Sequence, residues 1–426
     1  MVGGCDVEQL IQQFGSPLYI LDEVTLRTAC QQYRDLMARY YPGESLVLYA
    51  SKAWSCLAIC AVVKSEGLGI DVVSGGELFT ALKAGVTAEN LYFHGNNKSV
   101  EELKLAISAG CRIVADNWHE LRLLTQLLQQ ETTTVQILLR ITPGIECHTH
   151  EYIRTGHLDS KFGFDPDQIK AVFQYVSEQP KLQCLGLHAH IGSQIFELRP
   201  HRDLARIMVQ WIKLARDYDL PITELNIGGG LGICYTEEDD PPSIKDWVSA
   251  VAEAVVSACR QQEVALPRLL CEPGRSLVGS ACITGYTVGS QKTVPGTRDY
   301  ISVDGGMSDN PRPITYQSVY RALVANRMSA PLTKKVTLAG KHCESGDVII
   351  KEVWLPTLDT SDIIVVPATG AYNYSMASNY NRIPKPASVL VRDGEAHLII
   401  QRETFQDLIR QDYMPVTLMP DISTGP

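Results

Sequence analysis

Residues 46–55 read LVLYASKAWS and place a lysine two residues past an apolar run. The run LVLYA is short and continuously apolar, as is typical of a parallel strand that is buried on both faces. Lys52 therefore lies where a buried strand meets the next helix. A strongly hydrated ammonium group is unusual at such a position and needs a chemical reason.

Seven further strand-like runs follow this one along the chain. They are GIDVVS (69–74), NLYFHG (90–95), CRIVAD (111–116), VQILLRITP (135–143), LQCLGLHAHIG (182–192), ITELNIGGG (222–230) and RLLCEPG (268–274). Amphipathic segments such as residues 243–262 separate them. Eight strand–helix steps between about residues 45 and 275 predict a parallel (β/α)8 TIM-type barrel, with a doubly wound open sheet as the alternative.

The pattern changes after residue 276. Short β-prone runs are now separated by Gly, Pro and Asp, which predicts an antiparallel β domain. Residues 16–41 supply one more strand and a helix ahead of the barrel. We therefore expect an N-terminal segment at 1–25 that joins the β domain, a barrel at 26–275 and a C-terminal β domain at 276–426.

Composition limits the class of protein. The chain has 426 residues and a net charge of −10, which argues against a nucleic-acid partner because phosphate contacts need clustered Lys and Arg. No apolar run is long enough to cross a bilayer, and the start MVGGCDVEQL does not resemble a secretory signal. The 12 cysteines without CxxC spacing fit reduced thiols. We expect a cytoplasmic protein without membrane contact.

The ends of the predicted barrel strands carry polar or glycine residues. Because the carboxyl ends of barrel strands converge on one face, these residues should line a single cup. They are Lys52, Asp71, Ser74, His94, Gly95, Asp116, Arg140 to Pro143, His190, Ser193, Gly228 to Gly230 and Glu272 to Arg275.

The turn at Gly228–Gly230 has two interpretations. It lacks GxGxxG spacing and could be a flexible turn, but its backbone N–H groups could also hold a phosphate ahead of a helix N-terminus. The hydroxyl of Ser193 could bind the same phosphate, or it could serve only the turn. Glu272 could bind a cofactor, cap a helix or pair with Arg275.

His188 and His190 form the motif HAH, of which we expect one histidine to face the cup. A zinc site would need a third ligand, which the motif CHTH at 147–150 could supply. We expect no metal, because an aromatic cofactor that lies on His190 fits this position better.

A series of motifs, in order, resembles the diaminopimelate decarboxylase family. They run from Tyr49 to Asn381 and include YASKA, DVVSGGEL, GLHAHIGSQI, NIGGGLGI, EPGRSLVG, VDGGMSDNPRPITY, GKHCESGDVI and ATGAYNYSMASNYN. The resemblance implies a fold-type III pyridoxal-phosphate enzyme with an alanine-racemase-like barrel, which works as a homodimer. Two residues depart from the family pattern: Trp54 replaces the usual Asn, and Cys147 stands where Ala is frequent.

The resemblance implies that pyridoxal 5'-phosphate is the cofactor and that Lys52 forms a Schiff base with it. Burial at the barrel mouth should ease the loss of the lysine proton. His190 would stack on the ring and Glu272 would pair with the pyridine nitrogen. The full cofactor-binding set is Lys52, His190, Ser193, Gly228, Gly229, Gly230, Glu272, Pro273, Gly274, Arg275 and Tyr372.

The same resemblance assigns the substrate-binding residues. Arg275, Arg312 and Tyr316 would bind the distal carboxylate of diaminopimelate, and Glu344 would meet its distal ammonium. Tyr372 would contact substrate and cofactor. Cys343 would donate the proton that quenches the carbanion, and the resemblance implies that Cys343 and Glu344 come from the neighbouring subunit.

The implied reaction converts meso-2,6-diaminopimelate to L-lysine and carbon dioxide, the last step of lysine biosynthesis. The nearest alternatives are decarboxylases of ornithine, arginine or carboxynorspermidine. A substrate that ends in a bare amine has no use for Arg312 and Tyr316, which argues against the first two. An alanine racemase would have Arg at the pyridine nitrogen, and a non-enzymatic carrier of the cofactor would need only the barrel.

Overall fold

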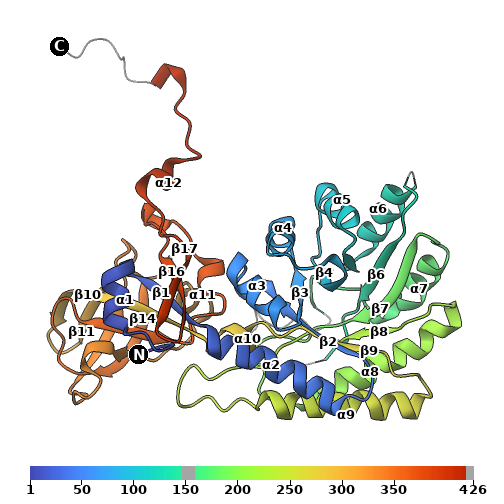
Figure 1. The fold of residues 1–426 in the computed structure, drawn as a ribbon, viewed down its shortest axis with the longest axis horizontal. Helices are drawn as coiled ribbons and strands as arrows, with labels where there is room; N and C mark the ends of the chain where they lie inside the picture. The colour runs from blue at the N-terminus through green and yellow to red at the C-terminus, as the bar shows by residue number, and fades with distance from the viewer. Residues whose placement is uncertain (130, 146–158, 419–426) are drawn as a thin grey trace.

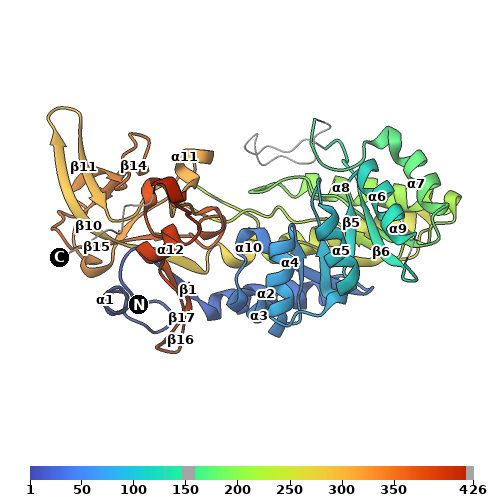
Figure 2. The ribbon, with the colours of Figure 1, turned by 90° about the horizontal axis from the view of Figure 1, so that it is seen from above.

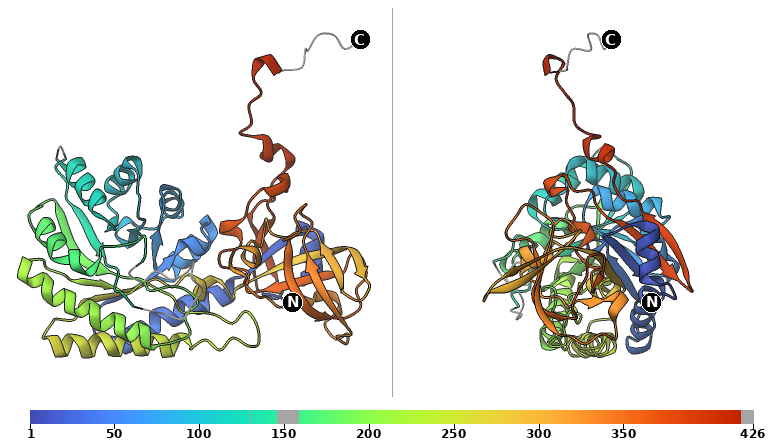
Figure 3. Two further views of the ribbon diagram at one scale, coloured as in Figure 1. Left: turned by 180° about the vertical axis from the view of Figure 1, so that it is seen from behind. Right: turned by 90° about the vertical axis from the view of Figure 1, so that its left-hand side faces the viewer.

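The computed structural model describes residues 1–129, 131–145 and 159–418. The chain forms a barrel surrounded by helices and a separate β body beside it (Figure 1). Seen from above, the two bodies lie end to end, with the N-terminal segment on the β body (Figure 2). The described residues at the C-terminal end, up to residue 418, extend away from both bodies (Figure 3).

Eight parallel strands close into the barrel. They are β2 (Ser45–Ala50), β3 (Gly69–Val72), β4 (Leu91–Phe93), β5 (Arg112–Ala115), β6 (Val135–Arg140), β7 (Leu182–His188), β8 (Glu224–Asn226) and β9 (Arg268–Cys271). Strand β2 pairs with β3 on one side and with β9 on the other, which closes the ring. All eight predicted strands are confirmed, and the open-sheet alternative is wrong.

The helices around the barrel alternate with these strands. They are α2 (Glu23–Tyr40), α3 (Leu57–Ser65), α4 (Gly75–Lys83), α5 (Val100–Ala109), α6 (Trp118–Leu128), α7 (Ile169–Ser177), α8 (Arg199–Ala215), α9 (Ile244–Gln262) and the short α10 (Arg275–Val278). Local sequence fixes where several of them begin. Ser74 caps α4 and Asn117 caps α6, and Ser99 forms a capping box with Glu102 at the start of α5.

Apolar side chains fill the inside of the barrel. Leu48, Tyr92, Val114, Leu138 and Leu270 form this inner core and are almost fully buried. A barrel of eight strands is filled by its own side chains and is not a pore. Any cavity must therefore lie above this core, at the carboxyl ends of the strands.

The β body holds a nine-stranded sheet. Its strands are β1 (Leu18–Asp22), β10 (Cys282–Val294), β11 (Arg298–Val303), β12 (Leu323–Val324), β13 (Lys334–Ala339), β14 (Val348–Leu355), β15 (Ile363–Pro367), β16 (Ala387–Arg392) and β17 (Glu395–Ile400). Most pairs are antiparallel, as predicted. Two pairs, β1 with β16 and β11 with β13, are parallel, so the sheet is mixed.

The N-terminal strand β1 lies between β10 and β16 and thus belongs to this sheet. Three short helices, α1 (Val7–Phe14), α11 (Arg312–Tyr316) and α12 (Phe405–Ile409), are additional to the elements expected from the sequence. No helix within the described part of the chain is both long and apolar enough to span a membrane.

Candidate active site

A cavity of about 620 Å³ lies at the carboxyl ends of the barrel strands, where residues of the β body contribute to its wall. Ten of the predicted site residues line it: Lys52, His190, Ser193, Gly230, Glu272, Gly274, Arg275, Arg312, Tyr316 and Tyr372. Five do not line it: Gly228, Gly229, Pro273, Cys343 and Glu344. The prediction that the strand ends line a single cavity is therefore confirmed.

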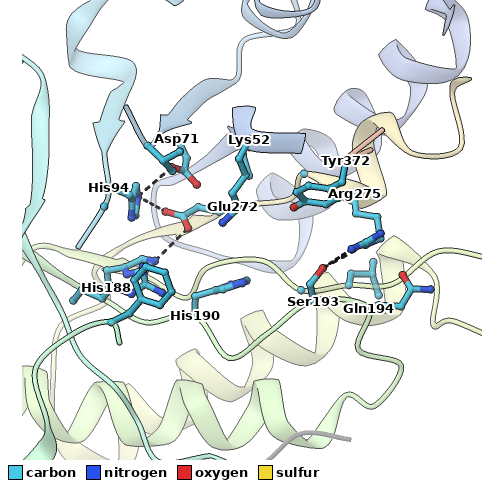
Figure 4. Close-up of a pocket in the computed structure, with 18 of the residues that line it drawn as sticks. Lys52, Asp71, His94, His188, His190, Ser193, Gln194, Glu272, Arg275 and Tyr372 are labelled. Carbon is cyan, nitrogen blue, oxygen red and sulfur yellow. Dashed lines mark hydrogen bonds and ion pairs between the residues drawn. The ribbon is translucent and has the colours of Figure 1, made fainter. Parts of the chain in front are cut away.

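Lys52 lies in the 3-10 turn η1 (Ser51–Ala53), directly after β2. Figure 4 shows its side chain directed into the cavity, toward Glu272 and His190. Burial alone lowers the pKa of Lys52, but the negative charges of Asp71 and Glu272 and the phenol of Tyr372 outweigh burial and raise the pKa above its ordinary value. The expectation that Lys52 loses its proton easily is therefore wrong, because these neighbours favour the charged form more than burial disfavours it.

Glu272 follows β9, and its carboxylate is held at both oxygens. Nε2 of His94 lies 2.8 Å from Oε1, and Nε2 of His188 lies 3.2 Å from Oε2. Nδ2 of Asn226 donates a further hydrogen bond of 2.6 Å to Oε1. Burial raises the pKa of Glu272, but the two histidines outweigh burial and keep the pKa well below its ordinary value. Glu272 is thus a fixed carboxylate inside the cavity, and neither a helix cap nor a partner of Arg275.

Both histidines of the HAH motif line the cavity. The expectation that only one would face it is wrong, because side chains two positions apart in an extended segment lie on the same face. Nδ1 of His190 accepts a hydrogen bond from the N–H of Gly229 at 3.2 Å, which fixes the ring. Burial lowers the pKa of His188 to about 3 and that of His190 well below its ordinary value.

Three ligand atoms, one each from His94, His188 and Glu272, lie within 4.8 Å of one another, close enough to hold a metal ion. They already contact one another directly, as described above. The predicted alternative ligands at 147–150 lie outside the described residues. The expectation that no metal binds here stays a prediction.

The glycine turn after β8 packs against the turn after β9. A Cβ atom on Gly229 would lie 2.1 Å from the carbonyl oxygen of Glu272, so no side chain fits there. The N–H of Gly228 donates to Oδ1 of Asn226 at 2.9 Å, and that of Gly229 to His190. Gly230, with φ of +121°, is the glycine of this turn that lines the cavity.

The turn after β9 supports the strand that leads to Lys52. The carbonyl of Pro273 accepts a hydrogen bond of 3.1 Å from the N–H of Ala50. A Cβ atom on Gly274 would lie 3.0 Å from Cβ of Ala50. Glycine at this position therefore allows the two strand ends to approach each other closely.

Two arginines lie at the opposite end of the cavity from Glu272. Arg275 lies on the far side of Lys52 from Glu272 (Figure 4) and donates a hydrogen bond to Oγ of Ser193 at 3.0 Å. Arg312, on α11 of the β body, donates to Oγ of Ser318 at 3.0 Å. Both arginines are buried, and both donate to the hydroxyl oxygen of Tyr235.

Cys343 and Glu344 lie on the surface of the β body, in the loop between β13 and β14. The N–H of Cys343 donates to Oδ1 of Asn381 at 2.8 Å. A carboxylate oxygen of Glu344 lies 3.4 Å from the hydroxyl of Tyr380. Both residues are exposed and absent from the cavity wall of their own chain.

Comparison with known proteins agrees with this geometry. Residues 24–279 match the pyridoxal-binding domain of pyridoxal-dependent decarboxylases. Diaminopimelate decarboxylase of Synechocystis sp. is 63% identical, and the match covers 98% of this chain and 91% of the relative. The chain belongs to the diaminopimelate decarboxylase family.

Other members of the family are similar along almost the whole chain. The enzyme of Bacillus subtilis is 47% identical over 96% of this chain and 94% of its own. The crystal structure of the M. jannaschii enzyme in complex with L-lysine has a TM-score of 0.91 at 31% identity and covers 98% of this chain and 100% of the other. The expected fold class, decarboxylase activity and pyridoxal phosphate cofactor are thereby confirmed.

The cavity residues fit the cofactor of this family. A lysine amine can bond to the aldehyde, and a buried carboxylate suits the pyridine nitrogen. At the other end, the Ser193 hydroxyl offers a donor for a phosphate, and the guanidinium of Arg275, which donates to that hydroxyl, can bind a further anion. The 620 Å³ volume is within the range of small-molecule sites.

Sequence reasoning assigned no role to several residues of the cavity wall. Asp71, His94 and Arg140 were noted at strand ends, which was a usable signal. Burial raises the pKa of Asp71 to about 6, although His94 and Lys52 oppose this shift. Tyr235 is not part of the wall but contacts two arginines that are. Nothing in its local sequence indicates that these two distant arginines meet at its hydroxyl.

Proposed function

We propose that this enzyme converts meso-2,6-diaminopimelate to L-lysine and carbon dioxide, the last step of lysine biosynthesis. One observation carries the proposal: Arg275 and Arg312 are buried together at one end of the cavity, and no carboxylate of the described residues pairs with either. Two buried guanidinium groups without an acidic partner favour an anion from the ligand. A substrate with a second, remote carboxylate supplies that anion.

The reacting end of the substrate lies at the other side of the cavity in this proposal. Bound pyridoxal phosphate supplies the electron sink for the electron pair that remains when carbon dioxide departs. Lys52 holds the cofactor, and the carboxylate of Glu272 keeps the pyridine nitrogen protonated. His190 packs against the ring, while Ser193 and Gly230 bind the phosphate.

The neighbours of Glu272 support its role. Because His94, His188 and Asn226 all contact its oxygens, the carboxylate stays ionised in a buried place. A fixed negative charge there favours a proton on a facing ring nitrogen. Gly228, Gly229 and Pro273 then act through backbone packing that holds Glu272 and His190 in place.

At the substrate end, Arg275, Arg312 and Tyr316 bind the distal carboxylate. Tyr372 lies 4.9 Å from the guanidinium carbon of Arg275, measured to the ring centroid, and contacts both substrate and cofactor. Tyr372 lines the cavity, and its φ of +62° is a left-handed conformation that is uncommon for a residue other than glycine.

The active unit in this proposal is a homodimer. Cys343 and Glu344 of the partner subunit complete each cavity, where the cysteine donates the proton to the former α-carbon and the glutamate meets the distal ammonium. Their exposure on the β body, away from the cavity of the same chain, supports this arrangement.

We also propose the division into 1–25, 26–275 and 276–426 and a cytoplasmic location. Strand β1 at the edge of the first segment pairs with β10 and β16, which supports its assignment to the β domain. The 11 described cysteines carry free thiols, the state that a reducing compartment maintains.

The alternative substrates fit the cavity less well. Ornithine and arginine have no second carboxylate for Arg275 and Arg312. Carboxynorspermidine has a single carboxylate, which decarboxylation removes. An alanine racemase would place a cation where Glu272 lies, and a simple carrier of the cofactor would not need the wall that the β body supplies.

Product analysis tests the proposed function. Purified enzyme with pyridoxal phosphate should form L-lysine and carbon dioxide in equal amounts from meso-diaminopimelate. Release of the cofactor with hydroxylamine, followed by dialysis, should abolish both products, and added pyridoxal phosphate should restore them. Consumption of diaminopimelate without lysine, or no consumption at all, would refute the proposal.

A further inference from the structure

The hydroxyl oxygen of Tyr235 is shared by the two arginines of the cavity. Arg275 and Arg312 each donate an Nη1 hydrogen bond to it, the latter at 2.5 Å. The guanidinium carbon of Arg312 lies 4.9 Å from the centroid of the Tyr235 ring, and that of Arg275 lies 5.8 Å from it. The tyrosine therefore contacts both cations through its oxygen and through its ring.

Each guanidinium has a second support on its other side. Ser193 accepts from Nη2 of Arg275 at 3.0 Å, and Ser318 accepts from Nη2 of Arg312 at 3.0 Å. Hydrogen bonds thus link five side chains in a continuous row, in the order Ser193, Arg275, Tyr235, Arg312 and Ser318. The row joins the barrel, which contributes Tyr235 and Arg275, to α11 of the β body.

This arrangement answers an electrostatic problem. Two buried like charges repel strongly when no counter-charge separates them, and the described residues include no carboxylate that pairs with either arginine. Burial raises the pKa of Tyr235, but Arg275 and Arg312 outweigh burial and lower the pKa below its ordinary value. The hydroxyl oxygen accepts a hydrogen bond from each guanidinium group, so it lies between the two cations and holds them together.

The position of Tyr235 does not depend on the arginines alone. Its backbone N–H donates to Oδ2 of Asp239 at 2.9 Å, and its ring packs edge-to-face on Tyr320 at a centroid distance of 5.3 Å. The loop therefore holds the phenol in place before any ligand arrives. Nε of Arg312 is buried and has no hydrogen-bond partner among the described residues.

We propose that Tyr235 is a positioning residue for substrate selection, whose hydroxyl holds Arg275 and Arg312 together as a preformed receptor for a remote carboxylate. The inference rests on the proposed function, because it assumes that these arginines bind the distal carboxylate of the substrate. Preorganisation lowers the cost of binding, so loss of the hydroxyl weakens substrate binding more than it slows the chemical step.

Tyr235→Phe tests the proposal, because it removes one oxygen and keeps the ring. The variant should raise KM for meso-diaminopimelate about tenfold and change kcat by less than about twofold. With an analogue that lacks the distal carboxylate, KM should be unchanged. Tyr320→Phe is the matched control: its hydroxyl lies 3.4 Å from Oδ1 of Asn373, no arginine in the described part of the chain donates to it, and the variant should match the wild type.

Three outcomes separate the inference from the proposed function. If the wild type does not decarboxylate diaminopimelate, the proposed function fails. If the wild type is active and Arg312→Ala raises KM but Tyr235→Phe does not, the proposed role of Tyr235 is wrong. An equal rise in KM for both substrates would also overturn it, since the hydroxyl would then be merely structural.

Ser318→Ala keeps the proposal testable if Tyr235→Phe does not fold. This variant removes the support at the other side of Arg312 and leaves the aromatic packing intact. It should raise KM selectively for the substrate with the remote carboxylate. An unchanged KM would count against a receptor that depends on the positions of the arginines.

Discussion

The indole ring of Trp54 stacks on the phenol ring of Tyr374, with centroids 5.8 Å apart and planes inclined by 24°. Tyr19 of strand β1 packs against both rings, at 5.7 and 5.6 Å. Trp54 follows Lys52 by two residues, and Tyr374 follows Tyr372 by two residues. Lys52 lies in the turn next to Trp54, and Tyr372 lies in the loop of the β body next to Tyr374. The aromatic cluster therefore holds this turn and this loop together.

A hydrogen-bonded contact reinforces the same junction. The carbonyl of Ala53 accepts from the N–H of Tyr372 at 2.8 Å and from Oγ of Ser375 at 3.0 Å. Trp54, which we expected to differ from the family pattern, thus has a structural role at this junction. A large aromatic ring at this position fills the space between the barrel and the β body.

Trp54→Ala should lower the free energy of unfolding by about 3–5 kcal/mol, because it removes a fully buried ring from this cluster. It should also lower kcat, since Lys52 and Tyr372 lose a shared support. Chemical denaturation and steady-state kinetics measure the two effects. Trp354→Ala, at an exposed tryptophan of β14, should change neither, and equal losses in both variants would contradict this role of Trp54.

Lys52→Ala should abolish the covalent link between cofactor and protein, together with decarboxylase activity. The measurement is reduction with borohydride followed by mass spectrometry of the peptides, alongside the visible absorbance. Lys64→Ala, at an exposed lysine of α3, serves as the control and should keep both properties. Cofactor that remains reducibly attached in Lys52→Ala would show that another lysine holds it.

The barrel could be predicted from sequence because its strands are buried on both faces. Continuous apolar runs such as LVLYA, each followed by a polar residue, are local signals that need no knowledge of distant contacts. The short helices α1, α11 and α12 gave no comparable signal. The parallel pairing of β1 with β16 could not be predicted either, because strands so far apart in sequence leave no local trace of their pairing.

A mixture of two inactive variants tests the shared active site. Lys52→Ala and Cys343→Ala homodimers should each be inactive. After subunit exchange, a hybrid dimer would hold one intact site, so about a quarter of the wild-type activity should return in an equal mixture. Absence of recovery, after exchange has been verified with labelled subunits, would show that Cys343 acts within its own chain or not at all.

Arg312→Ala should lower kcat/KM for meso-diaminopimelate by about thirtyfold or more, since truncation of a buried charge pair costs about 2–5 kcal/mol. The absorbance of the bound cofactor should be unchanged. Arg321→Ala removes an exposed arginine that pairs with Glu237, and it should behave as the wild type. A loss of equal size for an analogue without the distal carboxylate would mean that Arg312 is structural.

The details of the site that depend on tertiary contacts could not be predicted from sequence. The direction of the pKa shift of Lys52 follows from Asp71 and Glu272, which end strands other than its own. The role of Tyr235 depends on two arginines, one of which lies on the β body. By contrast, Glu272 and His190 were identified correctly as cavity residues because each closely follows a barrel strand.

A substrate panel tests the central claim most directly. Carbon dioxide release should be measured with meso-, LL- and DD-diaminopimelate, ornithine and arginine under identical conditions. The account predicts efficient release from meso-diaminopimelate, with formation of L-lysine. For ornithine and arginine it predicts a kcat/KM lower by about two orders of magnitude or more, because these two substrates lack the carboxylate that Arg275 and Arg312 bind. Release from ornithine or arginine at a rate equal to that from meso-diaminopimelate would contradict the account.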